Sequence, residues 1–443
     1  MQLLSRRSKL LLVLLVLLAC TELVVRGPLR FLAAADFNDF ISPYTQSRAL
    51  VQGQDPYSPQ VLVSLWPVIG THRPDFLAKD LADGSLIRKR GIPTAYPLTC
   101  FLLLVPLALL PWPIAYLTWL VFVLTLVIWG ISCLFSVGKF EWNNWRSYAF
   151  IAFALALAPL HTGLAAGSIV IAAVSLCGIA VAQDYGGKTA LAGMVLGLAV
   201  CLKPQIGLPF LVFYLLNRRW RLVGIAAVVA ATTGALPILR LAMSRTPWAE
   251  NYRIDNKVLL VEGMLGDFTE RNPIRYGLVN LQVLLYSIVH HPDTANFLAL
   301  VISAVLFTIW VALVLRKTSC DVLLSMSTLA VLSLLPVYHR FYDSFLLVFP
   351  LTWCLQNIYD RGHRAARTAI VLMVPFLVPG GSLLEQVQGR VPTALAHSWV
   401  WECIAMPHQI WLLLVLGCLL LWRMASEDRA SWRLEGTPSL PLR

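Results

Sequence analysis

Long apolar runs recur along the chain, separated by short polar or basic breaks. A helix needs about 20 apolar residues to cross the hydrocarbon of a bilayer. These runs are continuous and leucine-rich, without the alternation of a membrane barrel strand, so they predict helices. The candidate spans are approximately 9–25, 97–111, 114–136, 147–160, 165–183, 189–202, 204–217, 221–242, 295–315, 321–338, 341–357, 366–382 and 408–423, with 279–290 weaker. The pattern predicts an all-α polytopic transmembrane protein with about 11–13 spans.

Basic residues gather beside the predicted spans. The clusters are Arg6, Arg7 and Lys9; Arg218, Arg219 and Arg221; Arg316 and Lys317; and Arg361 to Arg367. Because loops rich in Lys and Arg stay in the cytoplasm, we expect both termini there, including a tail at 424–443. The loops 26–96, 243–294 and 383–407 then lie outside. We expect one membrane domain over 1–443, with short surface helices in the outer loops.

This topology requires one segment that does not cross the membrane. An odd number of crossings must join the loop 26–96 to the basic cluster at Arg218, but six candidate segments lie between them. Proline interrupts the helical hydrogen-bond ladder, so breaks are expected at 111–113 and 203–205, and a further break at 161–163. Non-helical backbone at membrane depth is buried in protein or lines a cavity. The breaks therefore predict an internal polar cavity.

Composition narrows the functional classes. Of 443 residues, 58% are apolar and 13% are charged, about half the charged fraction of a soluble domain. The net charge of +12 falls mainly beside the spans, which indicates membrane topology and no nucleic-acid partner. The sequence has no CxxC pair, Cys/His cluster, DxD-type motif or nucleotide-binding fingerprint. We therefore expect no metal and no cofactor.

Two aspartates, Asp36 and Asp39, follow the first predicted span. A carboxylate beside apolar surface has a raised pKa and can act as a general base. The alternative is that both aspartates cap a surface helix. Further on, Gly53 is expected to end a helix, and Asp55 to Tyr57 to form a turn.

Candidate cations lie further along the chain. Lys203 is ionisable among apolar spans, which marks a functional site unless its ammonium reaches an interface. His339, Arg340 and Asp343 interrupt an apolar run on the predicted outer side. They place a base, a fixed cation and a carboxylate within two helical turns, and the planar guanidinium of Arg340 suits a phosphate. His161 is expected to be a buried, hydrogen-bonded histidine.

Spaced motifs over roughly residues 30–345 match a known pattern. They are Asp39-Phe40, Pro43-Tyr44, Ala49-Leu50, Gly53-Gln54-Asp55-Pro56-Tyr57, Tyr96-Pro97-Leu98, Pro106 to Pro111, Leu191 to Gln205, and Arg218 to Arg221. Together they resemble glycosyltransferase family 87, a group of GT-C membrane transferases. Pro43 stands where the family usually has an aromatic residue, and Gly167-Ser168 stands where it often has Gly-Gln.

The resemblance implies a GT-C-type fold and a sugar transfer at the outer face of a bacterial inner membrane. A polyprenyl-phosphate sugar drawn from the membrane lipids would donate a mannose-like hexose or a pentose to a lipid or glycan acceptor, with inversion. Asp39 is favoured as the general base, and Asp36 is the competing choice. Lys203, Arg340 and His339 are expected to bind the donor phosphate. The expected substrate contacts are Tyr44, Arg48, Asp55, Tyr57, Gln205 and Asp343.

Two other functions remain open. A transporter or flippase of lipid-linked sugars would place its ionisable residues near mid-membrane and often shows inverted repeats, but no repeat is visible here. The other function is that of a catalytically silent relative that serves as an assembly partner.

Residues 245–276 are rich in charged residues, with Trp and Tyr between them. They form either an acceptor-binding lid or a solvated connector.

Overall fold

The computed structural model describes residues 6–34, 39–67, 96–260, 263–316, 321–359, 363–396 and 398–435. Regular structure in these ranges is helical, apart from one isolated bridge between Leu278 and Arg340. The prediction of an all-α fold is confirmed. Asp36 lies outside the described residues.

Five helical segments in the described ranges are long and apolar enough to cross a membrane. They are Ser8–Ala33, formed by α1 (Arg6–Arg26) and α2 (Pro28–Ala33), α8 (Trp112–Val137), α14 (Trp220–Met243), α17 (Pro292–Arg316) and residues His408–Ser426 of α23 (His408–Glu435). Two bent pairs raise the number to seven: α9 (Trp145–Ala156) with α10 (Ala158–Ala166), bent by 42°, and Arg364–Leu377 with Gly380–Arg390, bent by 46°.

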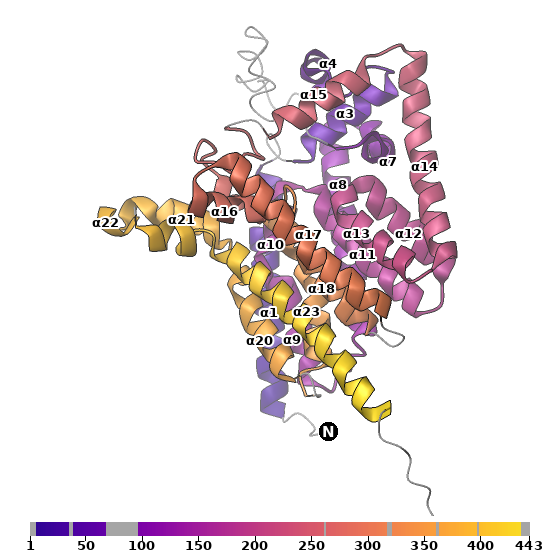
Figure 1. Ribbon diagram of the computed structural model, residues 1–443. Helices are drawn as coiled ribbons and strands as arrows, with labels where there is room; N and C mark the ends of the chain where they lie inside the picture. Colours follow the sequence, from indigo (N-terminus) through magenta and orange to yellow (C-terminus); the bar gives the residue numbers. More distant parts are fainter. Residues whose placement is uncertain are drawn as a thin grey trace, which may run out of the picture.

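Shorter helices account for most of the other expected spans. The apolar ones are α7 (Leu98–Ala108), α11 (Ile169–Tyr185), α12 (Thr189–Leu202), α13 (Pro204–Leu216) and α18 (Val322–Leu332). The span expected at 341–357 is a 3₁₀ segment, η2 (Phe341–Leu347), followed by α19 (Val348–Gln356). The region expected at 366–382 contains α20 (His363–Met373) and η3 (Val374–Leu377). Figure 1 shows α7, α11, α12, α13, α18 and α20 within the helical bundle.

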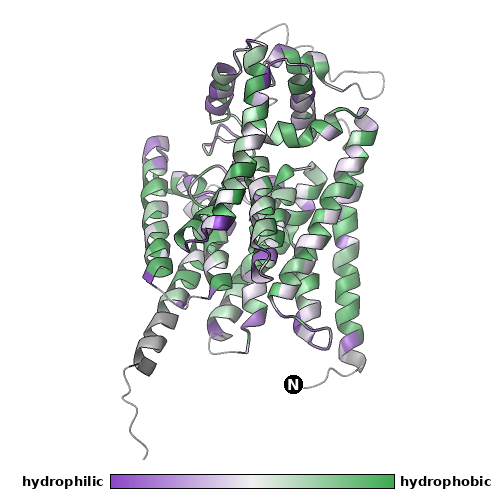
Figure 2. Ribbon diagram, turned by 90° about the vertical axis from the view of Figure 1, so that its right-hand side faces the viewer, coloured by the Kyte–Doolittle hydropathy of each residue, from purple (hydrophilic) through white to green (hydrophobic). Residues whose placement is uncertain are grey.

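Short helices occupy the connecting segments, as the sequence predicted. They are α3 (Ile41–Val51), α4 (Pro59–Leu65), α15 (Trp248–Val258), η1 (Arg275–Gly277), α16 (Leu281–Val289), α21 (Gly380–Val387), η4 (Gln388–Arg390), α22 (Thr393–Ala396) and η5 (Trp401–Ala405). Figure 1 shows α3, α4 and α15 together at the upper end, and α21 and α22 projecting sideways from the bundle. The long helices are hydrophobic over most of their length (Figure 2), as helices against lipid must be.

Of the three predicted breaks, two occur. α7 ends at Ala108 and α8 begins at Trp112, which agrees with the break expected at 111–113. At Lys203, α12 ends, the backbone is extended (φ −149°, ψ 98°), and α13 begins at Pro204, because proline fits the first turn of a helix. The break expected at 161–163 is wrong. His161 lies inside α10, and the chain turns at Leu157 instead. Pro159 has no N–H, so it cannot donate the helical hydrogen bond to the carbonyl of Leu155. This carbonyl is hydrogen-bonded to Nε2 of His161 instead.

The C-terminal helix α23 extends beyond the span predicted at 408–423 and continues to Glu435, inside the segment 424–443 that the sequence assigned to a tail. The expected outer loop 383–407 consists largely of short helical pieces.

Candidate active site

The end of α10 holds the backbone of Asp39. The amide of Asp39 donates to the carbonyl of Ala166 at 2.7 Å. This carbonyl is near the helix end because Gly167 adopts a left-handed conformation, φ +67°, which terminates α10. A Cβ atom at Gly167 would lie 2.7 Å from the ring of Phe31. Only glycine therefore fits both the backbone and the space at this position.

The residue after Asp39 is fixed by aromatic packing. The Phe40 ring is fully buried and stacks on Trp119, with ring centroids 4.8 Å apart, and on Trp112 at 5.9 Å. The indole of Trp119 donates to the Gly167 carbonyl at 3.1 Å. The aromatic cluster thus ties Phe40 to the same helix end that binds the amide of Asp39.

Segment η2 approaches Asp39 from the other half of the chain. His339 accepts at its carbonyl from the amide of Val279 at 3.0 Å, which continues the bridge between Leu278 and Arg340. On α10, a Cβ at Gly163 would lie 2.4 Å from the side chain of Ile171 on α11 and 3.2 Å from the Cβ of Tyr342. The absence of a side chain at Gly163 therefore lets η2 pack closely against α10.

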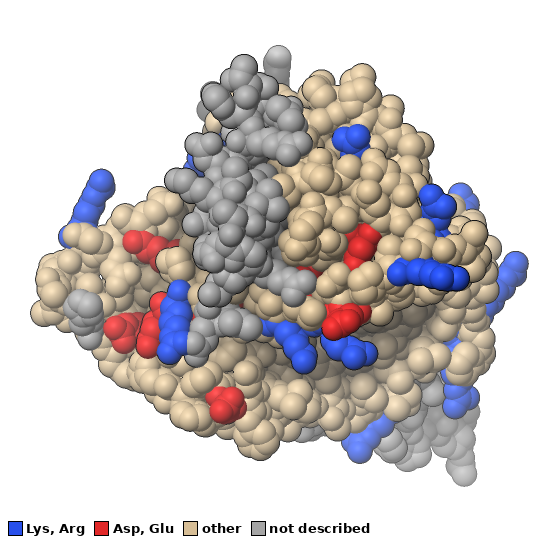
Figure 3. All heavy atoms as spheres, turned by 90° about the horizontal axis from the view of Figure 1, so that it is seen from above, with Lys and Arg blue, Asp and Glu red and all other residues tan. Residues whose placement is uncertain are grey.

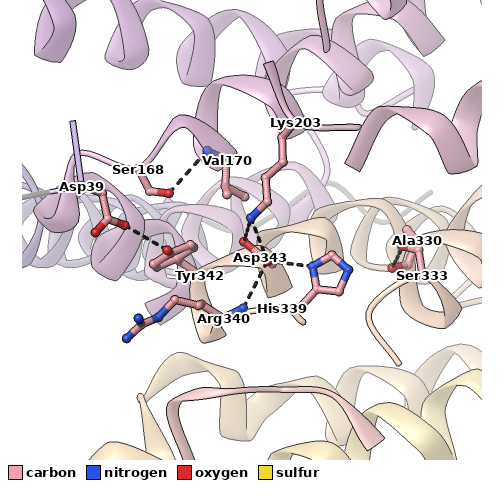
Figure 4. A network of polar contacts seen from close by, with 10 residues as sticks. All are labelled: Asp39, Ser168, Val170, Lys203, Ala330, Ser333, His339, Arg340, Tyr342 and Asp343. Atoms are coloured by element: carbon pink, nitrogen blue, oxygen red, sulfur yellow. Dashed lines mark hydrogen bonds and ion pairs between the residues drawn. The ribbon is translucent and has the colours of Figure 1, made fainter. Parts of the chain in front are cut away.

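A buried polar network is centred on Asp343 (Figure 4). Its carboxylate accepts from the Lys203 ammonium at 3.0 and 3.1 Å and lies 2.7 Å from Nδ1 of His339. It also accepts from the amide of Arg340 at 3.2 Å. Asp343 and His339 are fully buried, and Lys203 is 6% exposed. Lys203, His339 and Asp343, which the sequence suggested as separate contacts, form one network.

Asp39 joins this region through Tyr342. The Tyr342 hydroxyl donates to Oδ2 of Asp39 at 2.9 Å, and the Lys203 ammonium lies 5.8 Å from the centre of the Tyr342 ring. Figure 4 shows the Arg340 guanidinium pointing away from Asp343, on the side of Asp39 and Tyr342. Tyr342 was not among the site residues predicted from the sequence. Its one signal was its position inside the polar interruption at 339–343.

The electrostatic surroundings of Asp39 suit a proton acceptor. Burial raises the pKa of its carboxyl above the ordinary value of 3.8, and the positive charge of Arg340 and the hydrogen bond from Tyr342 reduce that rise without cancelling it. Arg340 is half-buried, and its guanidinium contributes a permanent positive charge to the surroundings of this carboxyl group. A carboxyl group with a raised pKa and a fixed cation thus occur together.

An apolar cavity of about 550 Å³ lies beside the network. Helices α13, α17 and α18 supply much of its wall, with Tyr252 and Asn256 of α15. Gln205 lines it two positions after Lys203, and Val337 two positions before His339. The structure therefore places Gln205 at this cavity rather than in the Asp343 network.

The other expected substrate contacts are engaged within the first part of the fold. The Tyr44 hydroxyl donates to the Leu110 carbonyl at 2.8 Å, and the Arg48 guanidinium lies over the Tyr44 ring at 5.9 Å. The Tyr57 hydroxyl donates to the Tyr96 carbonyl at 2.8 Å. Asp55 accepts from the Tyr57 amide at 2.9 Å. These bonds fold residues 41–57 against α7 and its neighbours.

The upper end of the molecule (Figure 3) carries acidic and basic side chains close together on an otherwise mostly uncharged surface. Helix α15, from the charged stretch expected to be a lid or a connector, lies at this end (Figure 1). Asn251 of α15 donates to Asp55 at 2.7 Å, which joins the stretch to the segment after α3. In the described ranges, no group of three or more His, Cys, Asp or Glu side chains is placed to hold a metal ion.

A bundle of apolar helices with a carboxylate, a guanidinium and an apolar cavity defines a multi-pass membrane protein with an enzyme-like site. The model of glycosyltransferase family 87 matches residues 94–337, more than half of the chain, and the chain belongs to that family. Membership indicates a membrane glycosyltransferase and confirms the resemblance seen in the sequence motifs. Neither a curated protein nor a solved structure matches the chain.

The residues matched by the family model include only part of the candidate site. Lys203 lies within it, whereas Asp39 precedes it, and His339, Arg340 and Asp343 follow it. The roles of these side chains therefore rest on their geometry.

Proposed function

We propose that this glycosyltransferase moves a mannose-like hexose or a pentose from a polyprenyl-phosphate sugar to a lipid or glycan acceptor. The observation that carries the proposal is the Asp39 carboxylate, which accepts from Tyr342 and feels the positive charge of Arg340, in a fold that also contains an apolar cavity. A sugar transfer needs a proton acceptor for the attacking hydroxyl and positive charge for the departing phosphate. Asp39 and Arg340 meet these two needs.

In the proposed reaction, an acceptor hydroxyl attacks the anomeric carbon and Asp39 takes its proton. The bond between the anomeric carbon and the phosphate oxygen breaks, and the polyprenyl phosphate departs with the electron pair. Arg340 stabilises the negative charge on that phosphate through its planar set of donors. The direct displacement inverts the anomeric configuration and forms no covalent intermediate with the enzyme.

A lipid-linked donor fits the cavity between α13, α17 and α18. Its walls are mostly apolar, with Leu208, Val212 and Phe307 among the lining residues. Burial of an isoprenoid chain there stabilises binding by about 25 cal/mol for each Å² of apolar surface removed from water. The chain would bring its phosphate to the end of the cavity near Val337, three positions before Arg340.

Lys203 and His339 both contact Asp343, so they are less available to the donor phosphate than Arg340 is. The Lys203 ammonium is hydrogen-bonded to both oxygens of Asp343. Any phosphate contact by Lys203 must therefore be shared with that carboxylate. Arg340, whose guanidinium points away from Asp343, is the better donor to the phosphate (Figure 4).

We also propose that both termini are cytoplasmic and that the site faces the outer side of a bacterial inner membrane. The basic clusters beside the spans support this orientation. The Asp39 segment follows α1 and α2, which together form the first candidate span. With the N-terminus in the cytoplasm, one crossing carries Asp39 to the outer side.

The test uses purified full-length protein in lipid vesicles with polyprenyl-phosphate mannose and mixed lipid and glycan acceptors. The variants are Asp39→Asn, Asp36→Asn and, as a matched control, Asp293→Asn, an exposed position on α17. We expect sugar transfer to fall by about 10²–10⁴-fold in Asp39→Asn, because a general base contributes that much. Transfer should stay at the wild-type rate in Asp293→Asn.

Transfer that survives Asp39→Asn and disappears in Asp36→Asn would contradict the assignment of the base. Movement of the sugar lipid across the vesicle without transfer would instead favour the transporter or flippase.

A further inference from the structure

The contact between Tyr342 and Asp39 joins two parts of the chain that are 303 positions apart. We propose that Tyr342 is a positioning residue that orients Asp39 for proton transfer, and that the buried Lys203–Asp343 ion pair holds Tyr342 in place. The inference rests on the proposed function, because it takes Asp39 as the base. It concerns the orientation and charge of that carboxylate.

The hydrogen bond selects one oxygen of Asp39. The Tyr342 hydroxyl donates to Oδ2 at 2.9 Å. This contact fixes the rotation of the carboxylate and leaves Oδ1 for the acceptor hydroxyl. A donor to a carboxylate also favours its ionised form, which is the form that accepts a proton.

Tyr342 is held from two sides. Its Cβ lies where the missing side chain of Gly163 lets η2 approach α10, and only 9% of Tyr342 is exposed. On its other side, the Lys203 ammonium lies 5.8 Å from the ring centre, within the range of a cation–π attraction. The ring has little freedom to rotate away from Asp39.

Asp343 fixes the backbone of the same segment. Its side chain accepts from the amide of Arg340, which closes the first turn of η2, and it binds Lys203 at 3.0 Å. Lys203 comes from the break between α12 and α13. The ion pair therefore connects this break to the residue immediately after Tyr342. An ion pair with no exposure on the carboxylate side has a definite geometry, because each buried charge must keep its partner.

Several charged or titratable groups face Asp39 and contribute to its protonation. They are Arg340, Lys203, Asp343, Tyr342, Tyr338 and Tyr96. Replacing Tyr342 by phenylalanine removes only a neutral hydroxyl from this set, so any change in titration comes from the lost hydrogen bond or from a shift of these neighbours.

The test compares wild type with Tyr342→Phe, and with Tyr214→Phe as the matched control. Tyr214 is also buried, on α13, and its hydroxyl has no hydrogen-bond partner among the described residues. The protonation of Asp39 is followed by infrared spectroscopy as the carboxyl band that Asp39→Asn abolishes. In parallel, kcat and KM for polyprenyl-phosphate mannose are measured against pH.

In Tyr342→Phe we expect the infrared titration of Asp39 and the acidic limb of kcat to move up by about one pH unit. That shift corresponds to roughly a tenfold change in ionisation, typical of a charge-assisted hydrogen bond. Most of the effect should lie in kcat rather than in KM. Tyr214→Phe should leave both curves at the wild-type position. An unshifted titration of Asp39 in correctly folded Tyr342→Phe would overturn the proposal.

A second variant tests the proposal independently, in case Tyr342→Phe misfolds. Replacement of Tyr342 by 3,5-difluorotyrosine keeps the ring and makes the hydroxyl a stronger donor, so the Asp39 titration should move to lower pH. A shift upward, or none, would contradict the proposal.

The role of Lys203 is tested by combination. Lys203→Met should raise the titration of Asp39, and adding Tyr342→Phe to it should shift the curve by less than Tyr342→Phe does alone. Fully additive shifts would show that the ion pair does not hold Tyr342. Absence of sugar transfer in wild type would refute the proposed function, whereas the infrared titration reports on Asp39 without turnover.

Discussion

The ammonium of Lys203 lies 3.0 Å from one carboxylate oxygen of Asp343 and 3.1 Å from the other, although 140 residues separate them in the chain. Both side chains are almost completely removed from solvent. The pair ties the break between α12 and α13 to the start of η2. One buried contact therefore joins two halves of the fold beside the candidate base.

Removing both partners of this pair should cost less stability than the sum of the two single removals. We expect Lys203→Met and Asp343→Leu each to lower the free energy of unfolding by about 3–5 kcal/mol, because each removes the ion-pair partner of a buried charge. The double variant should be less destabilised than the sum of the two. Denaturant unfolding of the purified protein in mixed micelles measures the three values.

The exposed pair of Glu22 and Arg26, with side chains 28% and 43% exposed, provides the control. Glu22→Gln should change stability by about 0–1 kcal/mol. Additive losses at Lys203 and Asp343 would contradict a direct interaction between them.

The raised pKa of Asp39 predicts opposite effects of pH on activity and stability. A base acts only when ionised, so kcat should fall as pH decreases through a value above the ordinary 3.8 of an aspartate. Protonation relieves the burial of this charge, so the contribution of Asp39 to stability should be fully present below the ordinary pKa of 3.8 and be lost as pH rises from there through the raised pKa. Profiles of kcat and of unfolding against pH, with Asp39→Asn as reference, measure both trends. Parallel trends that depend on Asp39 would refute the assignment.

Arg340 should act on the phosphate rather than on the fold. Arg340→Gln removes the charge and the planar donors, and should lower kcat/KM for polyprenyl-phosphate mannose by about 10²–10³-fold, as loss of one transition-state donor does. Arg340→Lys keeps the charge and should recover part of this loss. Arg316→Gln, at an exposed position ending α17, is the control. Equal activity of Arg340→Gln and wild type would exclude Arg340 as the phosphate ligand.

Hydropathy predicted the helical fold well because a bilayer demands long apolar runs. The helix boundaries at Leu202 and Pro204 followed from Pro204 itself, since proline marks the start of a helix. The misplaced break at 161–163 has a physical cause. The type of residue at 157, a leucine, does not indicate a turn. The chain turns there because Pro159, two positions later, cannot form a helical hydrogen bond to the carbonyl of Leu155.

The site was only partly predictable. Asp39, Lys203 and Asp343 stand out as charges among apolar residues, and the structure brings them close together. Their pairing was not predictable, because it depends on how η2 packs against α10 and α11. Tyr342 is an aromatic residue in a chain with 11% aromatic residues, so nothing in its type distinguished it. Only the tertiary structure shows that its hydroxyl is hydrogen-bonded to Asp39.

Gly167 should be needed both for stability and for the position of Asp39. Gly167→Ala places a Cβ 2.7 Å from Phe31 on a backbone with φ +67°. We expect a loss of about 1–2 kcal/mol from the left-handed conformation and about 1–3 kcal/mol more from the overlap. The rate of sugar transfer should fall too, because the adjacent Ala166 carbonyl binds the Asp39 amide.

Gly187 provides a matched control for this glycine. It has φ +75°, and a Cβ atom at this position would meet no atom of the described residues within 4 Å, so Gly187→Ala should show only the conformational cost. Equal losses of stability in Gly167→Ala and Gly187→Ala would show that the contact with Phe31 is easily relieved.

The cavity beside the site should bind the lipid chain of the donor. Leu208 and Val212 are one turn apart on α13 and line the cavity. Leu208→Trp should fill part of the 550 Å³ and raise KM for a long-chain polyprenyl-phosphate mannose by about tenfold, since a few lost methylene contacts at about 0.8 kcal/mol each suffice. A short-chain donor, which does not reach the blocked region, should be affected less. Leu215→Trp is the control, because Leu215 is on the same helix, is 42% exposed and does not line the cavity. If Leu208→Trp raised KM equally for both donors, or no more than Leu215→Trp does, the cavity would not be the site of the lipid chain.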